Sequence, residues 1–448
     1  MYLIKKSNFL LILCIIIITI TSCSNNTYKT SNSTSTLNQN LFLNINDTNE
    51  VELNYFSHEI ENGTRTKIIS SFEKKYPHIK INLIALPSNT DKKLEILLYA
   101  LNKKDSSIDL FDADITWPAI LVNQNLVAPL NNYITTAESD LWIDSAVSAN
   151  TINNNIYGVP YRLDAGMLYY RKDLLSKYNF SVPRTWDELI NISKYIMKKE
   201  PNMYGYAGSW KAFEGLTCNL LEFLWSFDGR LFSKKNELIL SSSNNLKAIT
   251  TMVNFRNKHH ITPKDILNYS SGDARELFNS GHLVFLRDWS SEWSKSQDPN
   301  TSQVINKIDI ANIPNAIYNK TTPSVIGGWQ IMVSNYSNHK KEAALFAKYR
   351  ASEYPQILSA KNLSHLPTLK SLYKNESVLK ELPFLKKIKN IISNTKYRPI
   401  HPNYHEISKL LQTMTHNIFT FENTPAQGLK ETELKISELL NKENQASQ

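Results

Sequence analysis

VELNYFSHEIENGTRTKIISSFEKKYPHIKINLIAL, residues 51–86, is the stretch of sequence that decides the fold. Its first seven residues alternate apolar and polar side chains, as a strand with one buried face does. The next part, residues 65–77, carries apolar residues at helical spacing, and Pro77 ends that helix. The last eight residues, IKINLIAL, predict a second strand. A strand, a helix and a strand in this order indicate a parallel pair of strands with a helix packed on it.

The same alternation continues for two more elements. DKKLEILLYALNKK, residues 91–104, predicts a helix, and IDLFDADIT, residues 108–116, predicts a third strand. The first third of the chain is therefore expected to form an open, mostly parallel sheet covered by helices. Ligands of such sheets bind beyond the carboxyl ends of the strands. Asp114 lies at one of these ends.

The rest of the chain predicts an α/β body with additional helices. We find no internal repeat and, after the N-terminal apolar run, no segment that predicts a membrane span. Helices are predicted at residues 167–178, 186–199, 211–227, 245–258, 340–352, 404–421 and 425–440. Strands are predicted within GHLVFLRD (281–288), KIDIANIP (307–314) and GGWQIMVS (327–334).

Composition bounds the class of protein. The chain has 448 residues, of which 42% are hydrophobic, so it is long enough for two or three domains. Its formal net charge of +9 comes from Lys and Arg that are scattered and mixed with acidic residues. A nucleic-acid-binding protein gathers its basic residues on one face or in one run. The sequence therefore does not indicate a nucleic-acid partner.

The N-terminus has the pattern of a lipoprotein leader. Lys5 and Lys6 precede an apolar run, residues 9–20, which has the length of a signal-peptide core. Thr21-Ser22-Cys23-Ser24 follows, and small residues before a cysteine resemble a bacterial lipobox. We expect residues 1–22 to be removed and Cys23 to carry the lipid. An ordinary signal peptide with an incidental cysteine is the alternative.

Two further expectations follow for the mature protein. Residues 23–46 are rich in Ser, Thr and Asn and predict a flexible tether between the lipid and the globular body. Cys14 would be lost with the leader, which leaves Cys218 without a disulfide partner. Cys218 is predicted to be buried in a helix.

Several kinds of catalytic and cofactor site are missing from the sequence. There is no glycine-rich phosphate loop, no G-x-S-x-G motif and no Cys-x-x-Cys pair, so no cofactor or metal is expected. His401 and His405 do not form an H-E-x-x-H motif, because Lys409 stands at the second histidine position. We interpret them as surface or capping histidines. Asp114 and Asp164 as the two carboxylates of a glycosidase remain an alternative.

Aromatic and charged side chains follow the predicted strands. Trp117 comes after Asp114, Trp289 and Trp293 come after LVFLRD, Trp329 follows two glycines, and Arg398 lies in YRPIHPNY. Sugars require this combination, because their C–H faces pack on aromatic rings and their hydroxyls pair with carboxylates and guanidinium groups. Each residue alone also fits a structural role, since most Trp side chains are in cores and many Asp side chains cap helices.

The order and spacing of several stretches resemble a known family. FEKKYP, DLFDADITWP, GVPYRLDAGMLYYRKDLLSKY, PRTWDEL, GGWQIMVSNYS and YRPIHPNY are similar to segments of family 1 extracellular solute-binding proteins of ABC sugar importers, in the trehalose/maltose-binding branch. The resemblance implies a two-lobed α/β fold of the periplasmic-binding-protein type (type II), with sugar bound between lobes joined by crossover strands. Lobe 1 would hold residues 47–159 and 325–375, and lobe 2 would hold residues 160–324 and 376–441.

The resemblance also implies a set of sugar-binding residues. Asp164 would point into the cleft, although a cap on a helix starting at Met167 is its structural alternative. The remaining implied residues are Asp114 and Arg398 for hydroxyls, Trp289 and Trp329 for stacking, Gly328 beside Trp329, Lys93 where the branch has Arg, and Glu61, with Glu59 as its rival. Arg162 and Ser291 replace aromatic residues of the branch, so the identity of the sugar stays open.

The function expected from these observations is that of a lipid-anchored, extracytoplasmic sugar receptor. It would capture a di- or oligosaccharide, deliver it to the permease subunits of an ABC transporter, and have no catalytic activity. Another polar solute, such as a glycerol phosphate, is the alternative among binding proteins. A glycosidase and a signalling receptor without transport are the alternatives from other classes.

Overall fold

The computed structural model describes residues 50–58 and 63–446, all of which belong to one unit of the chain, residues 42–448. The predicted leader (1–22), the predicted tether (23–46), Cys23, and Glu59 and Glu61 lie outside the described residues.

The first sheet contains the three strands predicted from the opening stretch of sequence. β1 (Val51–His58) pairs in parallel with β2 (Ile79–Leu86) and with β3 (Leu110–Asp114). The helices between them, α2 (Thr64–Lys75) and α3 (Thr90–Asn102), confirm the strand–helix alternation. The sheet order is β12-β11-β3-β1-β2, where β12 is Thr395–Lys396 and β11 is Ser324–Val333, and β6 (Gly158–Ala165) also pairs with β11. Asp114 is the last residue of β3, as predicted.

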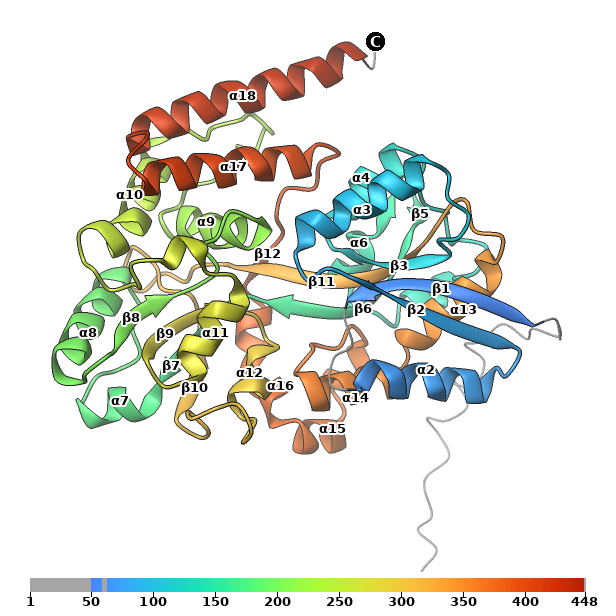
Figure 1. The fold of residues 1–448 in the computed structure, drawn as a ribbon, viewed down its shortest axis with the longest axis horizontal. Coiled ribbons are helices and arrows are strands. Elements are labelled where there is room, and N and C mark those ends of the chain that lie inside the picture. Colours follow the sequence, from blue (N-terminus) through green and yellow to red (C-terminus); the bar gives the residue numbers. More distant parts are fainter. Residues whose placement is uncertain (1–49, 59–62, 447–448) are drawn as a thin grey trace, which may run out of the picture. The chain divides into compact units, whose positions relative to one another are not determined.

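Two long antiparallel strands extend this sheet. β11 (Ser324–Val333) lies between β3 and β6 (Gly158–Ala165), so both of its edges are paired. Every residue of β11 is buried, which explains its nearly continuous apolar sequence. β12 (Thr395–Lys396) pairs with the beginning of β11. Figure 1 shows β6 and β11 running from the first sheet toward the second.

The second sheet has the order β10-β7-β9-β8. It is built from β7 (Met167–Arg171), β8 (Tyr204–Ala207), β9 (Leu283–Asp288) and β10 (Ile308–Ala311). β7 is antiparallel to β9 and β10, and β8 is parallel to β9. β6 leads through Gly166 directly into β7, so a single chain crossing joins the two sheets at this point.

The helix predicted at residues 167–178 is wrong in its first half. Residues Met167–Arg171 form β7, and the helix, α7, covers only Lys172–Lys177. MLYYR is buried at four of its five positions and has a strand partner on each side, so sheet pairing outweighs the helical spacing of its apolar residues. Because no helix begins at Met167, Asp164 cannot cap one there.

The other predicted helices are present within a few residues of their predicted bounds. α8 spans Trp186–Lys199 as predicted, because Thr185 and Glu188 form a capping box at its start. The other predicted ones are α9 (Glu214–Ser226), α10 (Ser243–Asn257), α13 (Lys340–Arg350), α17 (Tyr404–Phe419) and α18 (Pro425–Ala446). Three longer helices were not predicted: α11 (Ser271–Asn279), α14 (Glu353–Leu363) and α16 (Pro383–Ile392). The short ones are α4 (Trp117–Asn123), α5 (Thr136–Ser139), α6 (Asp144–Ser148), α12 (Glu292–Ser296) and α15 (Glu376–Glu381), with 3-10 turns at Ile266–Asn268 and Lys370–Tyr373. A small hairpin joins β4 (Thr151–Ile152) to β5 (Asn155–Ile156).

α9 is buried along its whole length. It packs against α10 and α17, and α17 packs in turn against α18. Cys218 is buried in α9, as predicted, and burial raises the pKa of its thiol. Among the helices of the described residues, none combines the length and the apolar character needed to cross a membrane.

Candidate functional site

Asp114 and Arg398 are in direct contact. The Nη2 group of Arg398 lies 2.8 Å from Oδ1 of Asp114, and both side chains are buried. The same carboxylate oxygen accepts hydrogen bonds from the backbone N–H of Thr116 at 3.0 Å and from its hydroxyl at 2.8 Å. Asp114 is thus held at the carboxyl end of β3 by three donors.

Glu214 completes this ion-pair group, and sequence reasoning missed it. The Nη1 group of Arg398 donates to Oε1 of Glu214 at 2.7 Å, and the hydroxyls of Tyr404 and Ser408 each donate to the same carboxylate at 2.6 Å. Burial raises the pKa of Glu214, although the charge of Arg398 works in the opposite direction. Burial also opposes the charge of Arg398, but Asp114 and its other neighbours outweigh it and raise its pKa.

Trp329 lies next to Asp114. In the pairing of β11 with its neighbours, Trp329 is opposite Asp114 of β3 on one side and Arg162 of β6 on the other. The Nζ atom of Lys93 is 4.4 Å from the centroid of the Trp329 ring, and the Cζ atom of Arg162 is 5.7 Å from it. Trp117 contacts the ring edge-on at 5.9 Å. Two cations and two indoles therefore gather at this point of β11.

Lys93 is an unusual lysine. It comes from α3, its side chain is fully buried, and its Nζ atom has no hydrogen-bond partner among the described residues. Burial is the main reason that its pKa is lowered to about 7, and Arg162 and Arg65 lower it further against the opposing effect of Asp112 and Asp114. Lys93 can therefore change charge near neutral pH, and its buried amine carries donors that none of the described residues uses.

His58 and Asp112 lie against the same ring from the side of β1 and β3. The His58 ring meets Trp329 edge-on, with 4.1 Å between the ring centroids. Its Nδ1 atom is 3.2 Å from Oδ2 of Asp112. The same carboxylate accepts hydrogen bonds from the hydroxyl of Tyr55 at Oδ1 and from that of Ser57 at Oδ2. Burial lowers the pKa of His58 to about 4, so the ring is neutral at pH 7.

Asp164 lies on the other flank of β11. It is opposite Gly327 in the pairing of β6 with β11, and it is buried. Its Oδ1 atom accepts a hydrogen bond from Ser290 at 2.7 Å, and its Oδ2 atom is 3.3 Å from Nε of Arg162. Arg162 also contacts His365, whose Nε2 atom is 2.5 Å from Nη1. Arg162 thus joins Asp164 to the Trp329 ring.

Trp289 follows β9 and is held between an arginine and a glycine. The Cζ atom of Arg287 lies 4.4 Å from the Trp289 ring centroid, and Arg287 forms two 2.6 Å bonds with Glu222. On the other side, a Cβ atom at Gly327 would come within 2.9 Å of Cζ3 of Trp289. Gly328 has a different role, since a Cβ atom there would lie 3.1 Å from the backbone oxygen of Arg162 and push β6 away.

The structure therefore brings most of the predicted residues into one connected group. Trp329 links the Asp114–Arg398 pair to Lys93 and Arg162, and Arg162 leads on to Asp164. The carboxylates accept hydrogen bonds, the cations donate them, and the indoles offer apolar faces. Such a group is suited to binding a polar ligand with an apolar ring face.

Comparison with known proteins identifies the family. Residues 57–356 match the family described as bacterial extracellular solute-binding protein. The chain belongs to this family. A probable ABC transporter-binding protein of Deinococcus radiodurans is 30% identical to this solute-binding protein over 368 residues, which are 80% of this chain and 86% of that one. The multiple sugar-binding protein of Streptococcus mutans is 26% identical over 320 residues, 67% of this chain and 71% of that one.

The solved structures lead to the same family. Maltose-bound MalE3 of T. maritima superimposes on this solute-binding protein with a TM-score of 0.83 and 29% identity, covering 87% of this chain and all of that one. The likeness confirms the predicted two-lobed fold of the periplasmic-binding-protein type.

The two histidines that were predicted as surface or capping residues lie in different surroundings. His401 is half-buried, and its Nδ1 atom accepts a hydrogen bond at 3.0 Å from the backbone N–H of Asn403, which precedes the first residue of α17. His405 is buried in α17, so its prediction as a surface or capping residue is wrong. Its Nδ1 atom is 4.0 Å from Oδ1 of Asp91, and its Nε2 atom is 3.8 Å from Oε1 of Glu95. In the part of this solute-binding protein that the structure describes, no three His, Cys, Asp or Glu side chains are placed to hold a metal ion.

Proposed function

We propose that this solute-binding protein is a sugar receptor that captures a di- or oligosaccharide and delivers it to the permease of an ABC transporter. The observation that carries the proposal is the set of donors, acceptors and indole faces that meet at β11. The names of its relatives support it, since one is a multiple sugar-binding protein and another holds maltose. A third is a probable ABC transporter-binding protein.

Each residue of the group has a proposed part in binding. Asp114 and Asp164 accept hydrogen bonds from sugar hydroxyls, and Arg398 donates to hydroxyl oxygens. Trp329 and Trp289 pack on the C–H faces of the rings. The existing bonds among these side chains hold them in position, which lowers the entropic cost of binding.

The remaining proposed residues are Gly328, Lys93, Arg162 and Glu61. Gly328 lets β6 approach β11 closely, and Lys93 and Arg162 offer donors beside the Trp329 ring. Glu61, which lies outside the described residues, is proposed to contact the sugar on the basis of the resemblance.

Arg162 and Lys93 together favour a ligand other than maltose. An aromatic residue at position 162 would offer a flat apolar face, whereas Arg offers directed donors for hydroxyls or for an anionic group. Trehalose, another compact disaccharide, or a sugar with an acidic or phosphate substituent is therefore proposed. The unpartnered Nζ of Lys93 favours a second candidate, an anionic polyol such as a glycerol phosphate.

A thermal-shift screen of the protein against neutral sugars, polyols and their phosphates tests the proposal. A ligand that binds only the native state adds RT ln(1 + [L]/Kd) to the free energy of unfolding, which is about 2.7 kcal/mol at a hundredfold excess over Kd. We expect at least one compact disaccharide or sugar phosphate to raise Tm. A panel in which no sugar or polyol changes Tm contradicts the proposal, and release of monosaccharide would show an enzyme instead.

Anchoring and domain division complete the proposal. We infer that Cys23 becomes the lipid-bearing N-terminus on the outer side of a membrane and that residues 23–46 form the tether. Lobe 1 is proposed to hold residues 47–159 and 325–375, and lobe 2 residues 160–324 and 376–441. Mass spectrometry of the mature protein tests the anchor, because Cys23→Ala should leave an unprocessed or unlipidated chain. A mature chain that begins at another residue contradicts it.

A further inference from the structure

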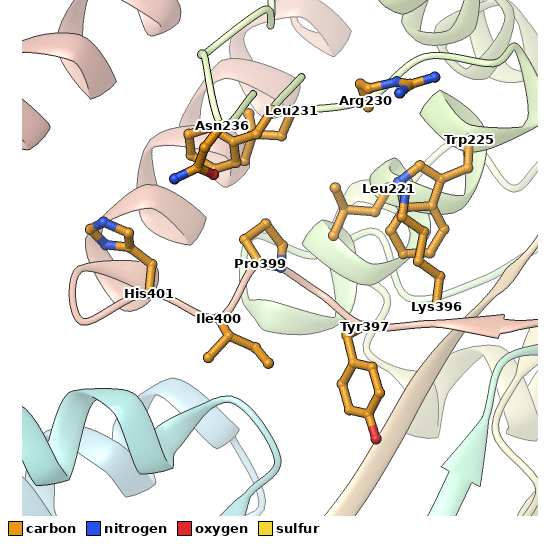
Figure 2. A pocket seen from close by; sticks show the side chains of 11 residues that line it. Leu221, Trp225, Arg230, Leu231, Asn236, Lys396, Tyr397, Pro399, Ile400 and His401 are labelled. Atoms are coloured by element: carbon orange, nitrogen blue, oxygen red, sulfur yellow. The ribbon is translucent and has the colours of Figure 1, made fainter. Parts of the chain in front are cut away.

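A hollow of about 240 Å³ lies next to the segment that carries Arg398, but on residues that the proposed sugar site does not use. Its walls are the end of α9, the loop that follows α9, and residues 396–401 (Figure 2). Figure 2 shows Pro399, Ile400 and His401 along one side of it, and Leu231 and Asn236 across from them.

The hollow has an uncompensated positive charge. Lys396 and Arg230 both line it, and none of its lining residues is acidic. Within residues 50–58 and 63–442, neither cation has a carboxylate at ion-pair distance. Burial lowers the pKa of Lys396, and the charge of Arg230 lowers it further. Two like charges that share a hollow are stabilised by an anion between them.

The same hollow offers apolar surface beside these charges. The Nζ atom of Lys396 is 4.9 Å from the ring centroid of Trp225, so charge and ring face are neighbours. Leu221, Phe232 and Pro399 line the hollow as well, and Ile400 is 55% exposed. A ligand that fits must therefore carry an apolar face as well as a charge.

We propose that this hollow is a second ligand site, which binds a small organic anion whose carboxylate or phosphate is attached to a ring with an apolar face. Lys396 and Arg230 pair with the charged group, because charge-assisted hydrogen bonds are the strongest available to such a ligand. The ring packs against Trp225 and the neighbouring aliphatic side chains. A neutral sugar would leave both cations without a counter-charge, so the hollow discriminates against it.

The position of the hollow couples it to the proposed sugar site, and this step rests on the proposed function. Tyr397 and Pro399 line the hollow, while Arg398 between them donates to Asp114 and Glu214. α9 also serves both sites, because Glu214 is at its start and Trp225 is near its end. An anion that orders residues 396–401 therefore changes the placement of Arg398. By linkage, sugar and anion alter each other's affinity by the same factor.

Calorimetric titration of the full chain tests the site. The probes are glucose 6-phosphate and benzoate, with glucose, benzamide and inorganic phosphate as comparisons. We expect at least one ring-bearing anion to bind about tenfold more tightly than its neutral partner, and inorganic phosphate to bind more weakly than that anion. Binding of glucose 6-phosphate alone identifies a sugar phosphate, and binding of benzoate alone identifies an aromatic carboxylate. No binding of either anion up to about 10 mM overturns the proposal, and so does inorganic phosphate that binds as tightly as the ring-bearing anions.

Variants assign the binding to the hollow. Lys396→Met and Arg230→Met should each weaken anion binding about tenfold. Lys235→Met is the matched control. Lys235 is an exposed cation in the loop that carries Arg230, but it does not line the hollow, so this variant should bind the anion with unchanged affinity. Equal losses in Lys396→Met and Lys235→Met would show that surface charge alone attracts the anion.

A last comparison separates this proposal from the sugar function. Trp329→Phe alters the proposed sugar site and should leave anion binding intact, so loss of anion binding in that variant would place the anion at β11 and overturn the second site. Once a sugar ligand is known, its Kd should change about threefold when the anion is saturating. If no sugar binds at all, the titrations of the anion still decide whether the hollow is a site.

Discussion

The side chains around Trp329 hold one another in place, while the Nζ atom of Lys93 has no hydrogen-bond partner among the described residues. Lys93 and Arg162 lie against the indole, and Arg398 bridges Asp114 and Glu214. A cation near an indole ring is attracted by its electron-rich face. A sugar ring that packs on that face would exchange these contacts for C–H packing and would give the cations hydroxyl oxygens as new partners.

Replacement of Trp329 tests whether a sugar ring packs on its indole face. Trp329→Ala should weaken sugar binding by about 2 kcal/mol or more if the ring is the buried aromatic anchor proposed for the ligand. Calorimetry measures the affinity, and circular dichroism measures the fold. Trp293→Ala is the control, since Trp293 also follows β9 but stacks on Phe384. If Trp329→Ala unfolds while Trp329→Phe folds and binds sugar normally, Trp329 is part of the core.

The buried amine of Lys93 should make the stability of the protein depend on pH. Its folded-state pKa of about 7 lies below the value of 10.5 for an exposed lysine, so the unfolded chain binds more protons between these values. The stability that depends on Lys93 should therefore rise with pH from about 7 to 10, because folding releases the proton of its amine and this release costs less as pH rises. Lys93→Met should be more stable than the wild type at about pH 6, and the difference should shrink as pH rises.

Urea unfolding at several pH values measures the effect of Lys93. Lys92→Met is the matched control, because Lys92 is the exposed neighbour on the same helix. A stability difference between wild type and Lys93→Met that does not depend on pH would mean that the amine is solvated in the native state.

At this scale, sequence could point to single residues but not to their partners. Asp114 and Trp329 lie in strands that were predicted from the sequence pattern, whereas Asp164 was found through the resemblance. Glu214 and His365 were missed because their contacts join residues 184 and 203 positions apart. Glu214 at the first position of a helix gives the same local signal as an exposed acidic residue that favours the helix dipole.

Among elements, the crossing strands β6 and β11 contribute most to the site. They carry Arg162 and Asp164 on one strand and Trp329 on the other. GGWQIMVS, within β11, predicted a strand because it is nearly all apolar. β6 was not predicted from its own sequence, and only the crossover strands implied by the resemblance pointed to it. MLYYR, just beyond β6, was predicted as helix because five residues are too few for their period to separate strand from helix. Only the pairing with β9 and β10 decides it.

Gly327 tests whether β11 positions Trp289. A Cβ atom at Gly327 would meet Cζ3 of Trp289 at 2.9 Å, so Gly327→Ala should displace that ring and weaken sugar binding about tenfold. Gly272→Ala is the control, because its Cβ atom would have 3.4 Å to the nearest atom and alanine favours the helix. Unchanged affinity in Gly327→Ala would mean that Trp289 does not contact the sugar.

On the scale of the whole molecule, polar contacts join α3, which connects two strands of the first sheet, to α17 and to the start of α9. α3 connects β2 and β3 of the first sheet, whereas α17 packs on α9 and α18. Lys409 of α17 lies 2.6 Å from Glu95 of α3, and Asp91 of α3 accepts hydrogen bonds from Gln412 and from the backbone N–H of Glu214. These bonds tie the two parts of the fold together and would have to break if the parts separate.

Sequence could foresee two lobes only through the resemblance, because nothing local in α3 or α17 indicates that they meet. The contacts between Asp91 and Gln412 join residues 321 positions apart. Amphipathic spacing shows that each helix has a buried face but not which element covers it.

Weakening the contact between α3 and α17 should change how the molecule closes on its ligand. If the two lobes hinge, sugar that touches both should favour the closed form and reduce the radius of gyration in small-angle scattering. Asp91→Ala removes the acceptor of two of the bonds between the parts, so it should populate the open form without sugar and raise the sugar Kd about threefold. Asp105→Ala is the control, because the exposed Asp105 side chain accepts a hydrogen bond from the backbone N–H of Ser107 in the same turn. A radius of gyration that stays the same at proven saturation, in both the wild type and Asp91→Ala, would show that the lobes do not hinge and that the α3–α17 contact is a permanent part of the fold.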